Sequence, residues 1–215
     1  VTKEVKDDLP HTAIASSPLN ILVYIFKMKF SLASLLIATM ATNAHATSLA
    51  VCRCNPDPHF FTWHGIYYDY HGGCDLVLIQ NPTFDGTDVF NLHIRTVPLN
   101  GWGGISNAVL QIGPDTMEVK DDGSYFINGM PGPTAAGIVA SLGSFGYQVS
   151  YAPGTPTDVW EVKLNPPQYV RITNFNYGVS TSGSISIEVY ADGSEFSDSV
   201  GMCGTWTQPG LIARD

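Results

Sequence analysis

Four unevenly distributed cysteines constrain this chain more than any other feature of its sequence. Cys52, Cys54 and Cys74 lie in one short block, and Cys203 lies close to the carboxyl-terminal end. The block Cys52–Cys74 also holds three of the six histidines. If Cys203 pairs with a cysteine of the block, the disulfide ties the start of a domain to its end. A bond that closes so long a loop restricts the unfolded chain strongly.

The segment before the cysteines has the features of a secretory signal peptide. Met28 is followed by a lysine, then by an apolar stretch, and then by Ala-His-Ala at 44–46. A positive start, a short apolar core and an Ala-x-Ala end are the three parts of such a peptide. We therefore expect residues 28–46 to be a signal peptide and residues 1–27 to be a non-native upstream extension. Residues 47–215 are then a secreted, extracellular domain.

A membrane anchor over Ile21–Ala41 is the competing interpretation. Lys27 and Lys29 lie inside that window, and the uninterrupted apolar run after them is shorter than the ~20 residues that a spanning helix needs. Elsewhere the sequence has no comparable stretch, so we expect no membrane span in the mature chain. An even number of cysteines behind a signal peptide predicts two disulfides.

Short β-branched and aromatic runs, separated by glycine and proline, dominate the sequence after residue 47. Asp122-Gly123 and Asn128-Gly129 predict hairpin turns with positive φ. Val159–Leu164 alternates polar and apolar residues, which predicts a strand with one wet and one dry face. This pattern predicts a single all-β domain, an antiparallel β-sandwich or a barrel. The expected strands are Phe60–Tyr70, Asp75–Gln80, Val89–Val97, Ala108–Ile112, Thr116–Lys120, Ser124–Ile127, Ile138–Ser141, Tyr147–Tyr151, Val159–Leu164, Tyr169–Asn174 and Ser184–Tyr190.

The cysteine block resembles the opening of a von Willebrand factor type D domain. The residues that match in order are Cys52, Pro56, Asp57, Pro58, His59, Phe60, Thr62, Gly65, Tyr68, Gly72, Gly73 and Cys74, followed by Leu76-Val77-Leu78. Gly201-Met202-Cys203-Gly204 resembles the closing Gly-Leu-Cys-Gly of that family. The resemblance covers essentially all of 47–215. It implies an extracellular, disulfide-stapled β-sandwich.

The resemblance also implies which cysteines pair. Carried over by position, Cys52 pairs with Cys203, and Cys54 and Cys74 remain for a second bridge. The residues alone leave open the alternative, in which Cys54 pairs with Cys203 and Cys52 with Cys74.

Two departures from the family pattern bear on function. His64 stands where the family has a calcium-binding aspartate, and Thr205-Trp206-Thr207 replaces the usual acidic loop. Calcium needs hard oxygen ligands, so we expect no cofactor and no metal, with Asp57 and His64 as marginal candidates. Val200 stands where multimerising relatives have a cysteine, so we expect no disulfide-linked multimer.

The charge balance argues against one class of binding partner. The chain carries 19 acidic and 10 basic residues, which argues against nucleic acid as a partner. We expect no enzyme, but a non-catalytic extracellular interaction or matrix module that binds a protein or a polysaccharide through residues that the sequence does not identify.

The alternative is a secreted metal-binding protein or metal-dependent hydrolase that uses His59, His64 and His71. On one continuous strand, His59 and His71 share a face and His64 points to the other. Asp57 and Asp69 are likewise far apart on an extended chain, so the sequence favours the non-catalytic interpretation.

Overall fold

The computed structural model of this chain describes residues 49–99, 102–175 and 185–207. In these ranges the regular structure is nearly all strand, apart from a 3₁₀ turn, η3 (Phe84–Gly86), and a one-turn helix, α3 (Gly193–Phe196). The strands are β1 (Ala50–Cys54), β2 (His59–Phe61), β3 (Tyr67–Asp69), β4 (Asp75–Asn81), β5 (Phe90–Leu99), β6 (Trp102–Ile112), β7 (Asp115–Lys120), β8 (Tyr125–Ile127), β9 (Met130–Pro131), β10 (Gly137–Leu142), β11 (Tyr147–Ala152), β12 (Thr157–Lys163), β13 (Tyr169–Phe175) and β14 (Ile185–Ala191).

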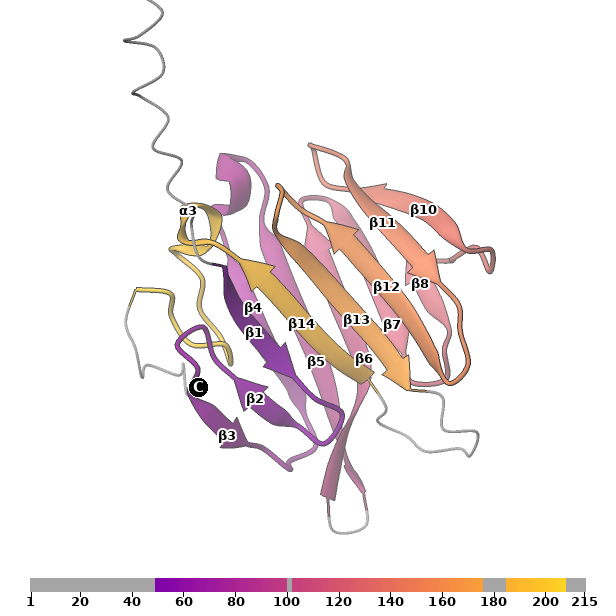
Figure 1. The fold of residues 1–215 in the computed structure, drawn as a ribbon, viewed down its shortest axis with the longest axis horizontal. Coiled ribbons are helices and arrows are strands. Elements are labelled where there is room, and N and C mark those ends of the chain that lie inside the picture. The colour runs from indigo at the N-terminus through magenta and orange to yellow at the C-terminus, as the bar shows by residue number, and fades with distance from the viewer. Residues whose placement is uncertain (1–48, 100–101, 176–184, 208–215) are drawn as a thin grey trace, which may run out of the picture. The chain divides into compact units, whose positions relative to one another are not determined.

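The strands form two antiparallel sheets that pack face to face (Figure 1). One sheet has the order β10-β11-β12-β13-β14-β1-β2-β3, and the other has the order β4-β5-β6-β7-β8-β9. In Figure 1 the eight-stranded sheet lies nearer the viewer, with the six-stranded sheet behind it. The fold is therefore an all-β, disulfide-stapled antiparallel sandwich, as the sequence predicts.

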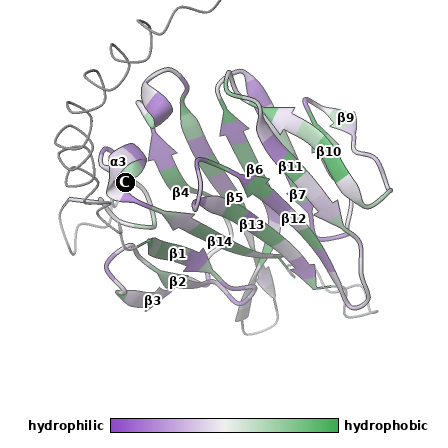
Figure 2. Ribbon diagram, turned by 45° about the horizontal axis from the view of Figure 1, so that its top comes forward, coloured by the Kyte–Doolittle hydropathy of each residue, from purple (hydrophilic) through white to green (hydrophobic). Residues whose placement is uncertain are grey.

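Alternating side chains give each sheet a dry inner face and a wet outer face. On β12, Trp160 and Val162 are buried between the sheets, whereas Glu161 and Lys163 point outward. Figure 2 shows the same alternation as green and purple bands along the strands. Each fully buried large side chain contributes about 1.5–3 kcal/mol to folding, so this alternation holds the two sheets together.

The last described segment returns to the six-stranded sheet and pairs with β4. Gln80 and Val200 exchange two backbone hydrogen bonds, of 2.8 and 2.9 Å. The next two amides continue the pairing, because Met202 donates to Val77 and Cys203 donates to Leu78. Cys203 is thereby held beside β4, the first strand of the six-stranded sheet.

A disulfide joins Cys203 to Cys52 on β1, with Cα atoms 5.6 Å apart. Since β1 belongs to the eight-stranded sheet, the bond crosses the sandwich from one sheet to the other. Both cysteines are fully buried. This is the pair that the resemblance implies, and it excludes the alternative pairing in which Cys54 bonds to Cys203.

The second bridge, between Cys54 and Cys74, is absent, and both residues are free thiols. Cys54 follows Cys52 by two positions on β1, so its side chain also enters the core, where it is fully buried. Cys74 is exposed, and its Sγ lies 2.9 Å from the hydroxyl of Tyr70. One sulfur faces the interior and the other faces the surface, so the two do not meet.

The predicted strand Phe60–Tyr70 is wrong as one continuous element. It is a hairpin of β2 and β3, in which His59 pairs with Asp69 and Phe61 with Tyr67. Gly65 adopts φ +71°, which glycine reaches without steric cost. The chain therefore turns at Gly65 and brings His59 and Asp69 side by side.

Two sequence predictions lie largely outside the described residues. Residues 1–27 and 28–46, expected to be an upstream extension and a signal peptide, are not among them. In the described part of the chain, no helix has the length and apolar character needed to cross a bilayer.

Candidate functional site

The β2–β3 hairpin gathers polar side chains that the sequence analysis treated as separate. His59 begins β2 and Asp69 ends β3, and the hairpin register places them opposite one another. The Nδ1 of His59 lies 2.5 Å from Oδ1 of Asp69 and 2.7 Å from the hydroxyl of Tyr67. The expectation that Asp57 and Asp69 lie far apart fails here, because the turn brings both carboxylates to His59.

Asp57 lies between two imidazoles. Its Oδ2 is 3.4 Å from Nε2 of His59, and its Oδ1 is 3.3 Å from Nδ1 of His71. The rings of His59 and His71 are edge to face, 6.4 Å apart. All three side chains are partly open to solvent, so they form a surface cluster with both acidic and basic members.

The hydroxyl of Tyr67 and the carboxylate of Asp69 perturb each other. Hydrogen bonding to Asp69 raises the pKa of Tyr67 to about 12. The same contact, together with the hydrogen bond from His59, lowers the pKa of Asp69. At neutral pH the cluster therefore contains an ionised Asp69 and a neutral Tyr67.

His64 does not join this cluster. Its Nε2 lies 3.2 Å from the backbone oxygen of Thr205, in the segment that follows Cys203. The neighbouring Trp63 donates its backbone N–H to Cys203 and packs on Trp206 with ring centroids 5.1 Å apart. The three imidazoles of the alternative hypothesis therefore do not converge. Among the described residues, no group of three or more His, Cys, Asp or Glu is placed to hold a metal.

A second candidate site lies on the outer face of the six-stranded sheet. An open depression of about 380 Å³ is centred on β5, β6 and β7 and includes the first residue of β4. Its polar lining comes from every second residue of these strands, because alternate side chains share a face. The strand register arranges these side chains in three rows across the sheet. The rows are Asp75–Arg95–Asn107–Lys120, His93–Val109–Glu118–Phe126 and Asn91–Gln111–Thr116.

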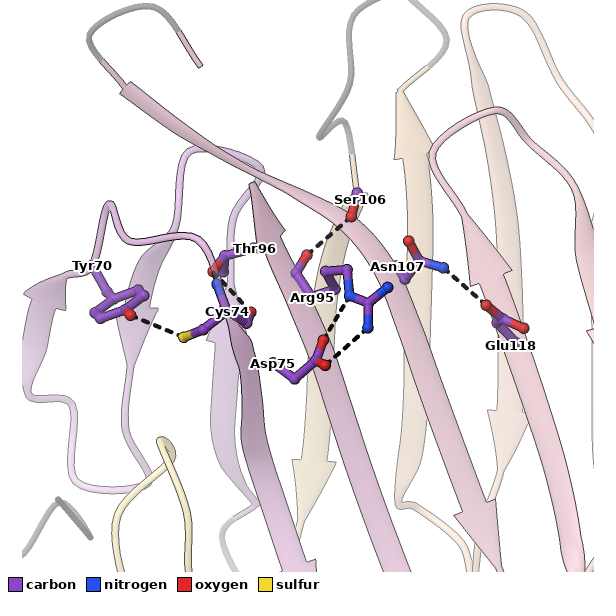
Figure 3. A network of polar contacts seen from close by, with 8 residues as sticks. All are labelled: Tyr70, Cys74, Asp75, Arg95, Thr96, Ser106, Asn107 and Glu118. Carbon is purple, nitrogen blue, oxygen red and sulfur yellow. Dashed lines mark hydrogen bonds and ion pairs between the residues drawn. The ribbon is translucent and has the colours of Figure 1, made fainter. Parts of the chain in front are cut away.

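The polar side chains of this face pair with one another across the strands (Figure 3). Arg95 makes a bidentate contact with Asp75, at 2.7 and 2.9 Å. Asn107 donates to Glu118 at 2.8 Å. The Arg95–Asp75 pair is largely open to solvent, so it adds little to stability. What these pairs provide is a set of hydrogen-bonding groups held in fixed positions.

A β-bulge in β6 shapes one side of this face. Arg95 pairs with Asn107 and Thr96 with Ile105, so Ser106 is the extra residue. Its hydroxyl lies 3.4 Å from the backbone oxygen of Arg95, as Figure 3 shows. The bulge keeps Asn107 on the outer face while Ile105 enters the core, which maintains the polar rows.

The sequence analysis did not identify this face. A signal was present, because Asn91, His93 and Arg95 occur at alternate positions within a predicted strand. The same spacing of two occurs from Asn107 to Gln111. The pattern marks outer faces but not which strands are neighbours, and only the register brings the two sets together.

Comparison with known proteins does not identify a family for this chain. No family model matches the sequence, and no curated protein sequence matches it. Function is therefore inferred from the geometry of the two candidate sites.

Proposed function

We propose that this protein is a non-catalytic extracellular interaction module that binds a polysaccharide or protein partner. The observation that carries the proposal is the open depression on the six-stranded sheet, with its rows of paired polar side chains. Both of its carboxylates are engaged, Asp75 by Arg95 and Glu118 by Asn107. Groups held in this way are suited to hydrogen bonding with a ligand rather than to proton transfer.

The proposal includes secretion and a relationship to von Willebrand factor type D domains. The bond between Cys52 and Cys203 supports it, because it links the opening and closing motifs on which the resemblance rests. Disulfides persist in oxidising, extracellular environments. The described residues do not favour the metal-binding alternative, since His64 lies with Thr205, away from the other two imidazoles.

We also propose that the family's calcium site has been replaced. The two segments to which the resemblance assigns calcium ligands do lie together, but they meet through His64 and the backbone of Thr205. Trp63 and Trp206 pack beside this contact. Imidazole and indole are poor calcium ligands. We expect the midpoint of thermal unfolding to be the same in millimolar calcium and in EGTA; a large rise with calcium would contradict this.

The interaction function is tested by direct binding. The oxidised chain is immobilised and presented with purified extracellular matrix proteins, neutral polysaccharides and anionic polysaccharides. Saturable binding to at least one class is expected. The control is the same chain after reduction and alkylation, which removes the Cys52–Cys203 bond. Absence of saturable binding to every class would contradict the proposal.

A further inference from the structure

The outer face of the six-stranded sheet has the composition that a sugar chain requires. Polar side chains form its two outer rows, and the middle row, His93–Val109–Glu118, has Val109 at its centre. Phe126 continues this row onto β8 beyond the depression, with the Lys120 ammonium 4.6 Å from its ring centroid. A sugar ring has an apolar face of C–H groups and a rim of hydroxyls. The apolar centre fits the ring face, and the polar rows fit the rim.

The charges on this face cancel in pairs. Asp75 is neutralised by Arg95, and the ammonium of Lys120 lies 3.8 Å from Glu118. A polyanion or a polycation would therefore meet a charge of its own sign as often as the opposite one. A neutral ligand meets no such penalty.

The face offers donors and acceptors together. Asn91 donates to Gln111 at 2.9 Å, and the amide of Gln111 donates in turn to the backbone of Gly113. A hydroxyl donates and accepts at once, so it can enter this network without leaving a partner unsatisfied.

We propose that this face is a binding site for a neutral polysaccharide, whose chain lies along the middle row across β5–β8. The inference rests on the proposed function and names its ligand class. Neighbouring strands are ~4.8 Å apart, so the row from His93 to Phe126 spans about 14 Å. That length exceeds one sugar ring, so the site recognises a segment of chain. The volume of about 380 Å³ is within the range of ligand sites.

The test is affinity electrophoresis of the full oxidised chain in native gels. The gels contain a neutral β-glucan, xyloglucan or galactomannan, or the anionic polymer polygalacturonate. The variants are Asn107→Ala and Gln111→Ala, singly and together. The matched control is Gln148→Ala, which removes an exposed glutamine from β11 of the other sheet. Thermal unfolding of each variant shows that the fold is retained.

We expect at least one neutral polysaccharide to retard the native chain. Each single variant weakens the binding by about tenfold, as expected for a lost hydrogen bond, and Gln148→Ala has no effect. If a neutral polymer binds but the two variants bind it equally well, the site is wrong although the interaction function stands. Retardation by polygalacturonate alone, or by none of the polymers, overturns the neutral ligand; saturable binding to a matrix protein would then leave the interaction function standing.

Discussion

At the scale of single residues, the two free thiols have opposite environments. Burial raises the pKa of Cys54 well above its ordinary value, whereas Cys74 is exposed. The thiolate is the reactive form, and the reagent must also reach it. We expect the native chain at pH 8 to react rapidly with Ellman's reagent at one equivalent, from Cys74. Cys54 should react only after denaturation.

Single substitutions separate the two thiols. Cys74→Ser should abolish the rapid phase, and Cys54→Ser should leave it intact. Two rapid equivalents would place Cys54 at the surface, and no free thiol in the denatured chain would mean that the second disulfide forms after all.

The carboxyl group of Asp85 predicts a pH dependence of the free energy of unfolding. Burial alone would raise its pKa, but hydrogen bonds from Asp88, Tyr147 and Thr87 outweigh burial and lower it. A folded pKa below the unfolded value means that the contribution to stability is complete above the unfolded pKa, ~3.9. That contribution is lost as the pH falls through the folded pKa.

The test is Asp85→Asn, because asparagine tolerates the positive φ of 50° found at this position. The free energy of unfolding should fall by about 1 kcal/mol at pH 7, and the difference from the native chain should be smaller at about pH 2, well below the unfolded pKa of ~3.9. Urea denaturation at both pH values measures it. An equal difference at both values would show that the carboxylate charge has no role.

At the scale of elements, the alternation of polar and apolar residues predicts most strands, because each sheet has one buried face. It locates β12 and β13 closely, where Trp160 and Val162, and Val170 and Ile172, alternate with more exposed residues. It fails where pairing rather than burial decides the structure. The segment from Phe60 to Tyr70 is rich in aromatic residues throughout, and the turn at Gly65 exists because β2 pairs with β1 on one side and β3 on the other.

In both candidate sites, too, alternation accounts for less than strand pairing does. Each residue of the outer-face depression lies in a strand that alternation finds or extends, yet the depression depends on the pairing register of consecutive strands, including the bulge in β6. The hairpin cluster at Asp57 and His59 depends on one turn. The sequence therefore predicts which side chains face outward, but not which of them meet.

Gly201 tests how tightly the closing segment, residues 200–203, is held against β4. It has φ +126°, and a Cβ there would lie 2.7 Å from the backbone oxygen of Leu78 and 2.8 Å from that of Val77. Gly137 has the same φ and open space around it. Gly137→Ala should cost about 1 kcal/mol from backbone strain alone. Gly201→Ala should cost about 1–3 kcal/mol more, because carbonyls of β4 cannot move aside.

Urea denaturation of the two variants measures this difference. Equal losses of stability would show that the closing segment is not held against β4 as tightly as the backbone hydrogen bonds indicate.

At the scale of the whole molecule, one covalent bond joins the two sheets near the opposite ends of the described chain. Cys52 and Cys203 are separated by 151 positions, so reduction releases a loop that contains nearly all of the sandwich. In the chain-entropy model a loop of this length contributes about 5 kcal/mol, near the upper limit for a single disulfide. A single-domain protein of this size has a total stability of about 5–15 kcal/mol. The bond is therefore a large part of what keeps the fold together.

The double variant Cys52→Ala/Cys203→Ala should lose about 2–5 kcal/mol of unfolding free energy, measured by urea denaturation without reductant. The double change leaves no unpaired thiol from the bond. Cys74→Ser is the matched control and should be nearly neutral, since Cys74 is exposed and unbonded. Reduction of the native chain should reproduce the loss. A loss below 1 kcal/mol would mean that the buried alternating faces alone hold the sheets together, and that the bond between them is not needed for stability.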